Sequence, residues 1–229
     1  MKRLFYHCSV TGPGHIRNGL PNQDSFLVRV WGQRWAVVVC DGVGSRSRSD
    51  IGSREAARAA VYCVKMLEFD ADNKLVVQIL YRCWLERLKD LGVQPSDAVT
   101  TCILVWGLAD GRFRYAHLGD GMIASPLEII SSGRNFGFSN ETTGLGLSRN
   151  LSDWNFGYSS LKEHANSLIL MSDGISEDLT DPQAFSRQIC HELLKKSQRQ
   201  AKNWLRNQLN AWPTPGHSDD KTIVVLCQK

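Results

Sequence analysis

A run of six apolar residues, Trp35 to Cys40, that ends at Asp41, Gly42 and Gly44 constrains the fold more than any other stretch. Three adjacent valines in so short a run are typical of a strand buried on both faces rather than of a helix. The run stops at a carboxylate, and the two glycines let the chain turn and let another group approach its backbone closely. The alternative interpretation is a simple turn after a buried strand. The residues at the other predicted strand ends must therefore distinguish a functional site from a turn.

Aspartates stand at four other predicted strand ends. Asp120 and Asp173 follow strands, whereas Asp24 and Asp219 precede them. In an antiparallel sheet the end of one strand lies beside the start of its neighbour. These four acids would therefore gather with Asp41 along one edge of the sheets. Close carboxylates repel one another unless cations lie among them, and such oxygen ligands suit Mg²⁺ or Mn²⁺ rather than Zn²⁺. We therefore predict a dinuclear metal cluster that activates a water and holds a phosphoryl group. The alternative is that each aspartate only forms a turn or caps a helix.

The remaining pattern predicts one domain in which helices lie outside strands. Two consecutive helices over about 50–69 and 73–91 have apolar stripes, so they form one layer over a sheet. Asp181-Pro182 begins one or two further helices that run to about residue 212. We expect Thr11-Gly12-Pro13-Gly14 to end the first strand and residues 15–24 to form a polar loop. Predicted strands cover residues 5–10, 25–31, 35–40, 100–108, 112–118, 122–124, 127–130, 167–171 and 222–227.

The composition excludes several classes of protein. The net charge of +4 is mild and its basic residues are scattered, so no nucleic-acid partner is indicated. No apolar run approaches membrane-spanning length, and the first ten residues lack the apolar core of a signal peptide. The seven cysteines lie within apolar patterns without CxxC spacing, which indicates reduced thiols in a cytoplasmic protein.

Six short motifs follow one another in order over nearly the whole chain, from about residue 12 to 227. They are Asn22-Gln23-Asp24, Val39-Cys40-Asp41-Gly42-Val43-Gly44, Thr100-Thr101, Gly119-Asp120-Gly121, Ser172-Asp173-Gly174 and Asp219-Asp220-Lys221-Thr222. This series resembles the motifs of the protein phosphatase 2C (PPM) family. Gly14-His15 followed by Pro21-Asn22-Gln23-Asp24 is similar to the small bacterial branch of that family.

The resemblance implies an α+β fold, a four-layer α-β-β-α sandwich of two antiparallel sheets flanked by helix pairs. Residues 1–229 would form a single domain, with the family's flap reduced to an irregular region at about 131–157. The implied activity is that of a metal-dependent serine/threonine phosphoprotein phosphatase, which uses metal-activated water and forms no phosphoenzyme. Its partners would be phosphorylated proteins and a cognate kinase, and the enzyme would be a monomer.

The resemblance also implies a role for each aspartate. Asp41 would bridge two metal ions, Mn²⁺ or Mg²⁺, and the Gly42 carbonyl would bind one of them. Asp173 and Asp219 would complete the other metal site, and Asp24 would act through metal-bound water. The expected catalytic residues are therefore Asp24, Asp41, Asp173 and Asp219.

A third, weaker metal ion is also expected. Asp120 matches the family's ligand for that ion. Glu177 lies four residues after Asp173, about one helical turn if a turn begins at Gly174, so it is a further candidate ligand. The alternative for Glu177 is an ordinary surface acid in a turn.

The chain departs from the family's motifs at three positions. Gly19 stands where an Arg usually holds the substrate phosphate, Val43 stands where eukaryotic members have a His, and Met122 replaces another frequent Arg. Either Arg17 or His15 would then contact the phosphate. Two other functions stay open: a catalytically weak or inactive regulatory module on the same fold, and a phosphatase of small phosphoesters.

Overall fold

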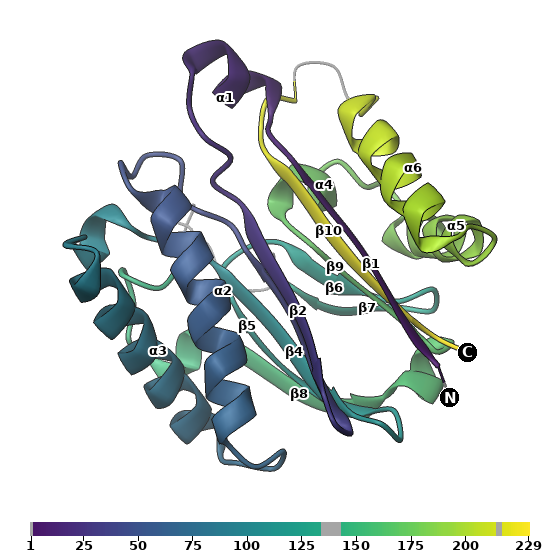
Figure 1. The fold of residues 1–229 in the computed structure, drawn as a ribbon, viewed down its shortest axis with the longest axis horizontal. Helices are drawn as coiled ribbons and strands as arrows, with labels where there is room; N and C mark the ends of the chain where they lie inside the picture. The colour runs from purple at the N-terminus through teal and green to yellow at the C-terminus, as the bar shows by residue number, and fades with distance from the viewer. Residues whose placement is uncertain (1, 134–142, 214–216) are drawn as a thin grey trace.

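Two five-stranded antiparallel sheets lie face to face between two layers of helices (Figure 1). The computed structural model describes residues 2–133, 143–213 and 217–229. The helices α2 and α3 cover one sheet, and α5 and α6 cover the other. The predicted four-layer α+β sandwich is thus confirmed. No helix in the described part of the chain is long and apolar enough to cross a membrane.

The strands of each sheet come from distant parts of the chain. The first sheet has the order β1-β10-β9-β6-β7, formed by Arg3–Val10, Lys221–Gln228, Ser167–Met171, Met122–Ala124 and Ile129–Ser132. The second has the order β2-β3-β4-β5-β8, formed by Ser25–Trp31, Arg34–Cys40, Cys102–Leu108, Arg112–Leu118 and Trp154–Ser160. The helices are α1 Pro13–Asn18, α2 Ser49–Met66, α3 Asn73–Asp90, α4 Asp173–Ser176, α5 Pro182–Leu194 and α6 Gln198–Asn210.

The central strand β3 is buried on both faces, as the valine run predicts. Val37 and Val39 point between the sheets, where they pack with side chains of β4, β9 and β10. Ala36 and Val38 point the other way, into the core beneath α2 and α3. The side-chain period of two in a strand therefore divides this apolar run between two cores. The end of β3 is held rigidly as a result.

The helical layers start where the sequence predicts. The side chain of Asp72 accepts hydrogen bonds from the first turn of α3, and Asp181 caps α5 with Pro182 in its first turn. Helix α2 packs closely through Gly52, because a Cβ there would lie 1.9 Å from the carbonyl oxygen of Ala98. This contact brings the start of α2 against the chain that leads into β4.

Regular elements lie within two of the regions expected to be irregular. Residues 15–24 do not form a loop throughout, because Pro13–Asn18 is the short helix α1. Pro13 at its start and Gly19 in the left-handed conformation at its end set its length, but six residues are too few to show helical periodicity.

The predicted irregular flap, 131–157, overlaps the edge strand β8, which begins at Trp154 and pairs with β5. Trp154, Phe156 and Tyr158 alternate with small or polar residues, a period-two signal that the Gly, Ser and Asn content of the region obscures. The rest of the expected flap includes residues 134–142, which lie outside the described residues.

Candidate metal centre

Asp41 is fixed at the end of β3 by two threonines at the start of β4. Its N–H donates to the Thr101 hydroxyl (2.9 Å), and its carbonyl accepts from the Thr101 N–H and the Thr100 hydroxyl, both at 2.8 Å. Gly42 follows in a position where a Cβ would lie 2.7 Å from the Ser49 carbonyl oxygen. Within the described residues, no hydrogen bond to the Gly42 carbonyl oxygen is formed, so this oxygen is available to a ligand.

Three of the predicted carboxylates meet at the seam between the two sheets. One carboxylate oxygen each of Asp41, Asp120 and Asp173 lies within 4.8 Å of the other two. Asp120 occupies the crossing from β5 to β6, between Gly119 and Gly121, which both have φ of +89°. A side chain at Gly119 would also strike Thr101, so the turn that presents Asp120 requires glycine.

Asp24 lies deeper, at the start of β2. Its Oδ2 accepts a hydrogen bond from the Ser172 hydroxyl (2.8 Å), which links it to the residue before Asp173. Its Oδ1 is buried and has no hydrogen-bond partner among the described residues. Burial raises the pKa of Asp24 to about 8, and the hydroxyls of Ser172 and Thr222 oppose this only in part.

The electrostatics of the cluster fit a bound divalent cation. Burial, and then the carboxyl groups of Asp24 and Asp173, raise the pKa of Asp41 well above its ordinary value. Asp173 Oδ1 is a second buried carboxylate oxygen without a hydrogen-bond partner. Such unpaired buried oxygens are unfavourable alone, whereas Mg²⁺ or Mn²⁺ would satisfy them and remove the mutual repulsion. The residues present therefore fit the metal ions that the sequence predicts.

Asp219 lies beside this cluster, but it is not one of the three carboxylates that meet there. It precedes β10, and partial burial followed by the nearby Asp173 carboxylate raises its pKa. Its main chain is fixed by the buried Lys221, whose Nζ donates to the Asp219 carbonyl at 2.9 Å. Asp219 is exposed, and its side-chain Oδ1 accepts a hydrogen bond from the Asp220 N–H at 2.8 Å.

Asp220, to which the sequence analysis assigned no role, is a buried structural carboxylate. It accepts hydrogen bonds from the N–H groups of Gly12 (2.7 Å) and Gln23 (2.6 Å), and it contacts His15 Nδ1 at 2.9 Å. The Gln23 carbonyl in turn accepts from the Gly42 N–H at 3.1 Å. Asp220 therefore ties α1, the start of β2 and the loop after Asp41 to the start of β10. The Asp-Asp doublet was the only sequence signal, and it does not tell which aspartate points inward.

Of the other predicted site residues, one lies beside Asp219 and two lie outside the carboxylate cluster. His15 lies near Asp219: a ring nitrogen of His15 and carboxylate oxygens of Asp219 and Asp220 all lie within 4.8 Å of one another. Arg17 is exposed on α1. Glu177 follows α4, where its N–H donates to the Asp173 carbonyl at 3.0 Å, but it is not part of the three-carboxylate cluster.

His117 on β5 is a further residue that the sequence analysis did not single out. Its Nε2 lies 3.2 Å from the Asp120 carbonyl oxygen, and its Nδ1 lies 2.8 Å from the Ser131 hydroxyl. Burial lowers its pKa to about 4, so the ring is neutral at pH 7. It supports the turn that presents Asp120.

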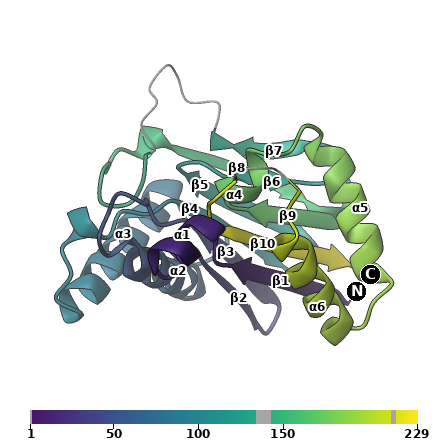
Figure 2. The same ribbon diagram turned by 90° about the horizontal axis from the view of Figure 1, so that it is seen from above.

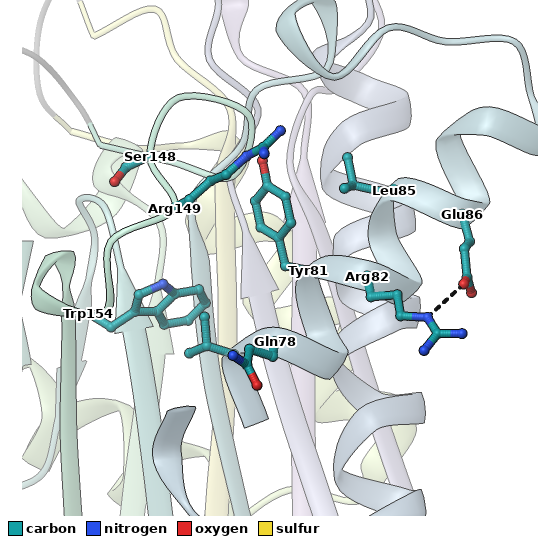
Figure 3. Close-up of a pocket in the computed structure, with 9 residues that line it drawn as sticks. Gln78, Tyr81, Arg82, Leu85, Glu86, Ser148, Arg149 and Trp154 are labelled. Carbon is teal, nitrogen blue, oxygen red and sulfur yellow. Dashed lines mark hydrogen bonds and ion pairs between the residues drawn. The ribbon is translucent and has the colours of Figure 1, made fainter. Parts of the chain in front are cut away.

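A separate groove of about 350 Å³ lies between α3 and the chain that leads into β8 (Figure 3). Tyr81 and Leu85 line it from α3, and Arg149 and Trp154 line it from the other side. The guanidinium of Arg149 lies 5.6 Å from the centre of the Tyr81 ring. None of the clustered carboxylates lines this groove, so it is distinct from the metal centre.

A family model matches most of the chain. Residues 11–210 match the family model for protein phosphatase 2C. The chain therefore belongs to the protein phosphatase 2C family, whose members are metal-dependent phosphatases. Curated proteins include none that matches the sequence of this chain.

Solved structures with the same fold share little sequence with this chain. PppA, a regulatory component of T6SS in Pseudomonas aeruginosa, has a TM-score of 0.70 and 18% identity, with 99% of this chain and 98% of PppA covered. The serine/threonine phosphatase Stp1 from Staphylococcus aureus has a TM-score of 0.68 and 15% identity, with coverage of 100% and 96%. RsbX in complex with magnesium has a TM-score of 0.58 and 17% identity, with coverage of 99% and 96%. At these identities the likeness supports the fold alone.

The raised pKa of Asp24 predicts how pH acts on the metal-free protein. Aspartate in the unfolded chain ionises near pH 4, whereas folded Asp24 keeps its proton up to about pH 8. The stability that the protonated carboxyl contributes is therefore present below pH 4 and is lost as the pH rises to 8. We expect thermal unfolding in EDTA to show a steeper loss of stability from pH 5 to 8 in the native protein than in Asp24→Asn. Equal slopes for the two proteins would contradict the pKa assignment.

Proposed function

We propose that this chain is a metal-dependent serine/threonine phosphoprotein phosphatase with a dinuclear Mn²⁺ or Mg²⁺ centre. The observation that carries the proposal is the meeting of three strand-end carboxylates within 4.8 Å, with a buried, unpartnered Asp173 oxygen among them. Fixed carboxylates at a seam of this kind hold hard divalent cations, which serve phosphoryl transfer.

In this proposal Asp41 and the Gly42 carbonyl would hold one metal ion, and Asp41 with Asp173 and Asp219 would hold the other. When bound, the ions supply an acidified water and neutralise charge on the phosphoryl group. Asp24 Oδ1, which is buried and has no partner among the described residues, would accept a hydrogen bond from a metal-bound water and so orient it. The hydrogen bond from Ser172 keeps the Asp24 carboxyl in this orientation.

The shape of the centre supports a phosphoprotein substrate over a small phosphoester. Asp41, Asp120 and Asp173 are all only partly buried, so a phosphoryl group on a protein chain can reach them without entering a deep pocket. Such a substrate implies a protein kinase as the source of the phosphoryl group. We propose that the enzyme acts in the cytoplasm as a monomer.

The first test replaces two of the carboxylates proposed to hold metal. Asp41→Asn and Asp173→Asn should each lower kcat by orders of magnitude with p-nitrophenyl phosphate and with phosphopeptides, because each removes charge that holds metal. The variants should stay folded, since removing one repelling charge relieves the cluster. Asp90→Asn, an exposed acid at the end of α3, is the matched control.

The outcomes of this test separate the candidate functions. Full activity in Asp41→Asn, or of the native protein in excess EDTA, would contradict the dinuclear centre. A native protein that binds Mn²⁺ but hydrolyses neither substrate would be the regulatory module. Hydrolysis of small phosphoesters without phosphopeptides would identify the third candidate function.

Asp120 would hold a third, weaker ion beside Asp173, with Glu177 as a further ligand one turn away. Few protein carboxylates would leave that ion mostly hydrated and therefore loosely bound. With Val43 unable to donate a proton, water at this site would serve the leaving oxygen. We expect Asp120→Ala to keep both tight ions in calorimetry, to lower kcat, and to raise the Mn²⁺ concentration at half-maximal rate. An unchanged metal-activation curve would exclude the third ion from the mechanism.

Arg17 and His15 are the cations proposed to contact the substrate phosphate in place of the Arg missing at Gly19. A guanidinium-phosphate hydrogen bond contributes about 1.5–3 kcal/mol. We expect Arg17→Ala or His15→Asn to lower kcat/KM for p-nitrophenyl phosphate at least about tenfold, whereas Arg29→Ala, an exposed cation on β2, should leave it unchanged. If neither variant changes kcat/KM more than about threefold, the phosphate binds elsewhere.

A further inference from the structure

Helix α1 is firmly held although it buries none of its residues. The Gly12 N–H donates to Asp220 Oδ1 at 2.7 Å, and the Gly14 N–H donates to the Ser218 carbonyl at 2.8 Å. The backbone at Gly12 lies so close that a Cβ would stand 2.3 Å from the Asp219 carbonyl carbon. The helix thus contributes no side chain to the core, although a buried carboxylate fixes its position. Its outer face is therefore held in place and accessible to other molecules.

The outer face of α1 is apolar and basic. Ile16 is 65% exposed and Leu20, just beyond the helix, is 44% exposed. Arg17 lies between them in sequence and is also exposed, and the first turn of the helix contains no acidic residue. Exposed apolar side chains are common singly, but these two lie within five residues of one firmly held segment with a cation between them in sequence, so the segment offers both apolar contact and positive charge to a peptide that carries negative charge.

This face adjoins the metal centre. Figure 2 places α1 beside the start of β10, and the ring of His15 approaches the Asp219 carboxylate. Asp219 is in turn close enough to Asp173 for the carboxylate to raise its pKa. A protein segment that delivers a phosphoryl group to these carboxylates would therefore pass α1 on the way.

We propose that Ile16 and Leu20 form a docking ledge for the segment that flanks the phosphorylated residue of a protein substrate, and that the ledge binds an apolar side chain of that segment. The inference rests on the proposed phosphatase function and adds a substrate preference to it. The dianionic phosphate complements the basic character of α1, which favours a phosphoprotein segment as the occupant over an uncharged one.

The test uses two phosphothreonine peptides that are identical except for leucines or alanines flanking the phosphothreonine. Native protein loaded with Mn²⁺ should bind and hydrolyse the leucine peptide at least about fivefold better, the effect of partly burying one leucine. The double variant Ile16→Ser/Leu20→Ser should lose this preference. Its kcat/KM for p-nitrophenyl phosphate should stay within about twofold of the native value, because that substrate has no flanking segment.

Met66→Ser is the matched control, because Met66 is 63% exposed and lies at the end of α2 remote from Asp41. It should keep the leucine preference. Because the substituted side chains are exposed, we expect unchanged circular dichroism and thermal midpoints in all variants. The pair Ile16→Ala/Leu20→Ala provides a milder second variant.

Three results would overturn the docking proposal. The native protein could bind the two peptides with equal affinity, or both double variants could keep the preference for the leucine peptide. The third result is a native dimer that dissociates in the double variants. The dimer would show that a second copy of the chain covers α1. Peptide affinity, measured by fluorescence anisotropy, does not need turnover. If native protein fails to hydrolyse any substrate, the phosphatase proposal fails, while the affinity ratio still decides whether α1 is a docking surface.

Discussion

Repulsion among carboxylates at the seam between the two sheets is the constraint on which the site depends. Asp41, Asp120 and Asp173 hold oxygens within 4.8 Å of one another, and burial adds to the unfavourable interaction. Strand ends can hold them there because β3, β5 and β9 are anchored by the apolar core between the sheets. The sandwich thus supplies the rigidity that holds these carboxyl groups together, at raised pKa values, until cations enter.

The neighbouring pair Asp219 and Asp220 shows how environment gives one residue type two roles. Asp220 is buried and satisfied by two backbone N–H groups and His15, so it behaves as part of the scaffold. Asp219 is exposed and lies close to Asp173, and the Asp220 N–H donates to its Oδ1 at 2.8 Å, so its carboxylate is held beside the cluster. Because the Gln23 peptide joins Asp220 to the Gly42 N–H, the scaffold acid also fixes the backbone beside Asp41.

The elements that the sequence predicts well are those whose signals are local and strong. The valine run of β3 and the starts of α3 and α5 have patterns within a few residues, and the structure confirms these elements. The convergence of Asp41, Asp120 and Asp173 follows from the antiparallel arrangement, so it could also be anticipated.

What the sequence could not predict depends on contacts between distant segments. Helix α1 is stabilised by hydrogen bonds to Asp220, which lies about two hundred residues further along the chain. The inward orientation of Asp220 itself, and the hydrogen bond from Ser172 to Asp24, likewise require the folded sheets. In β8 the alternating aromatic residues were present in the sequence, but its turn-forming residues concealed them.

A crystal structure of the protein grown with Mn²⁺ tests the central claim most directly, because anomalous scattering locates the metal without any assay of activity. The account predicts two strong anomalous peaks flanking the Asp41 carboxylate, one in contact with the Gly42 carbonyl and the other with Asp173 and Asp219. A seam without anomalous peaks, in which protons remain shared among the carboxylates at saturating Mn²⁺, would contradict it.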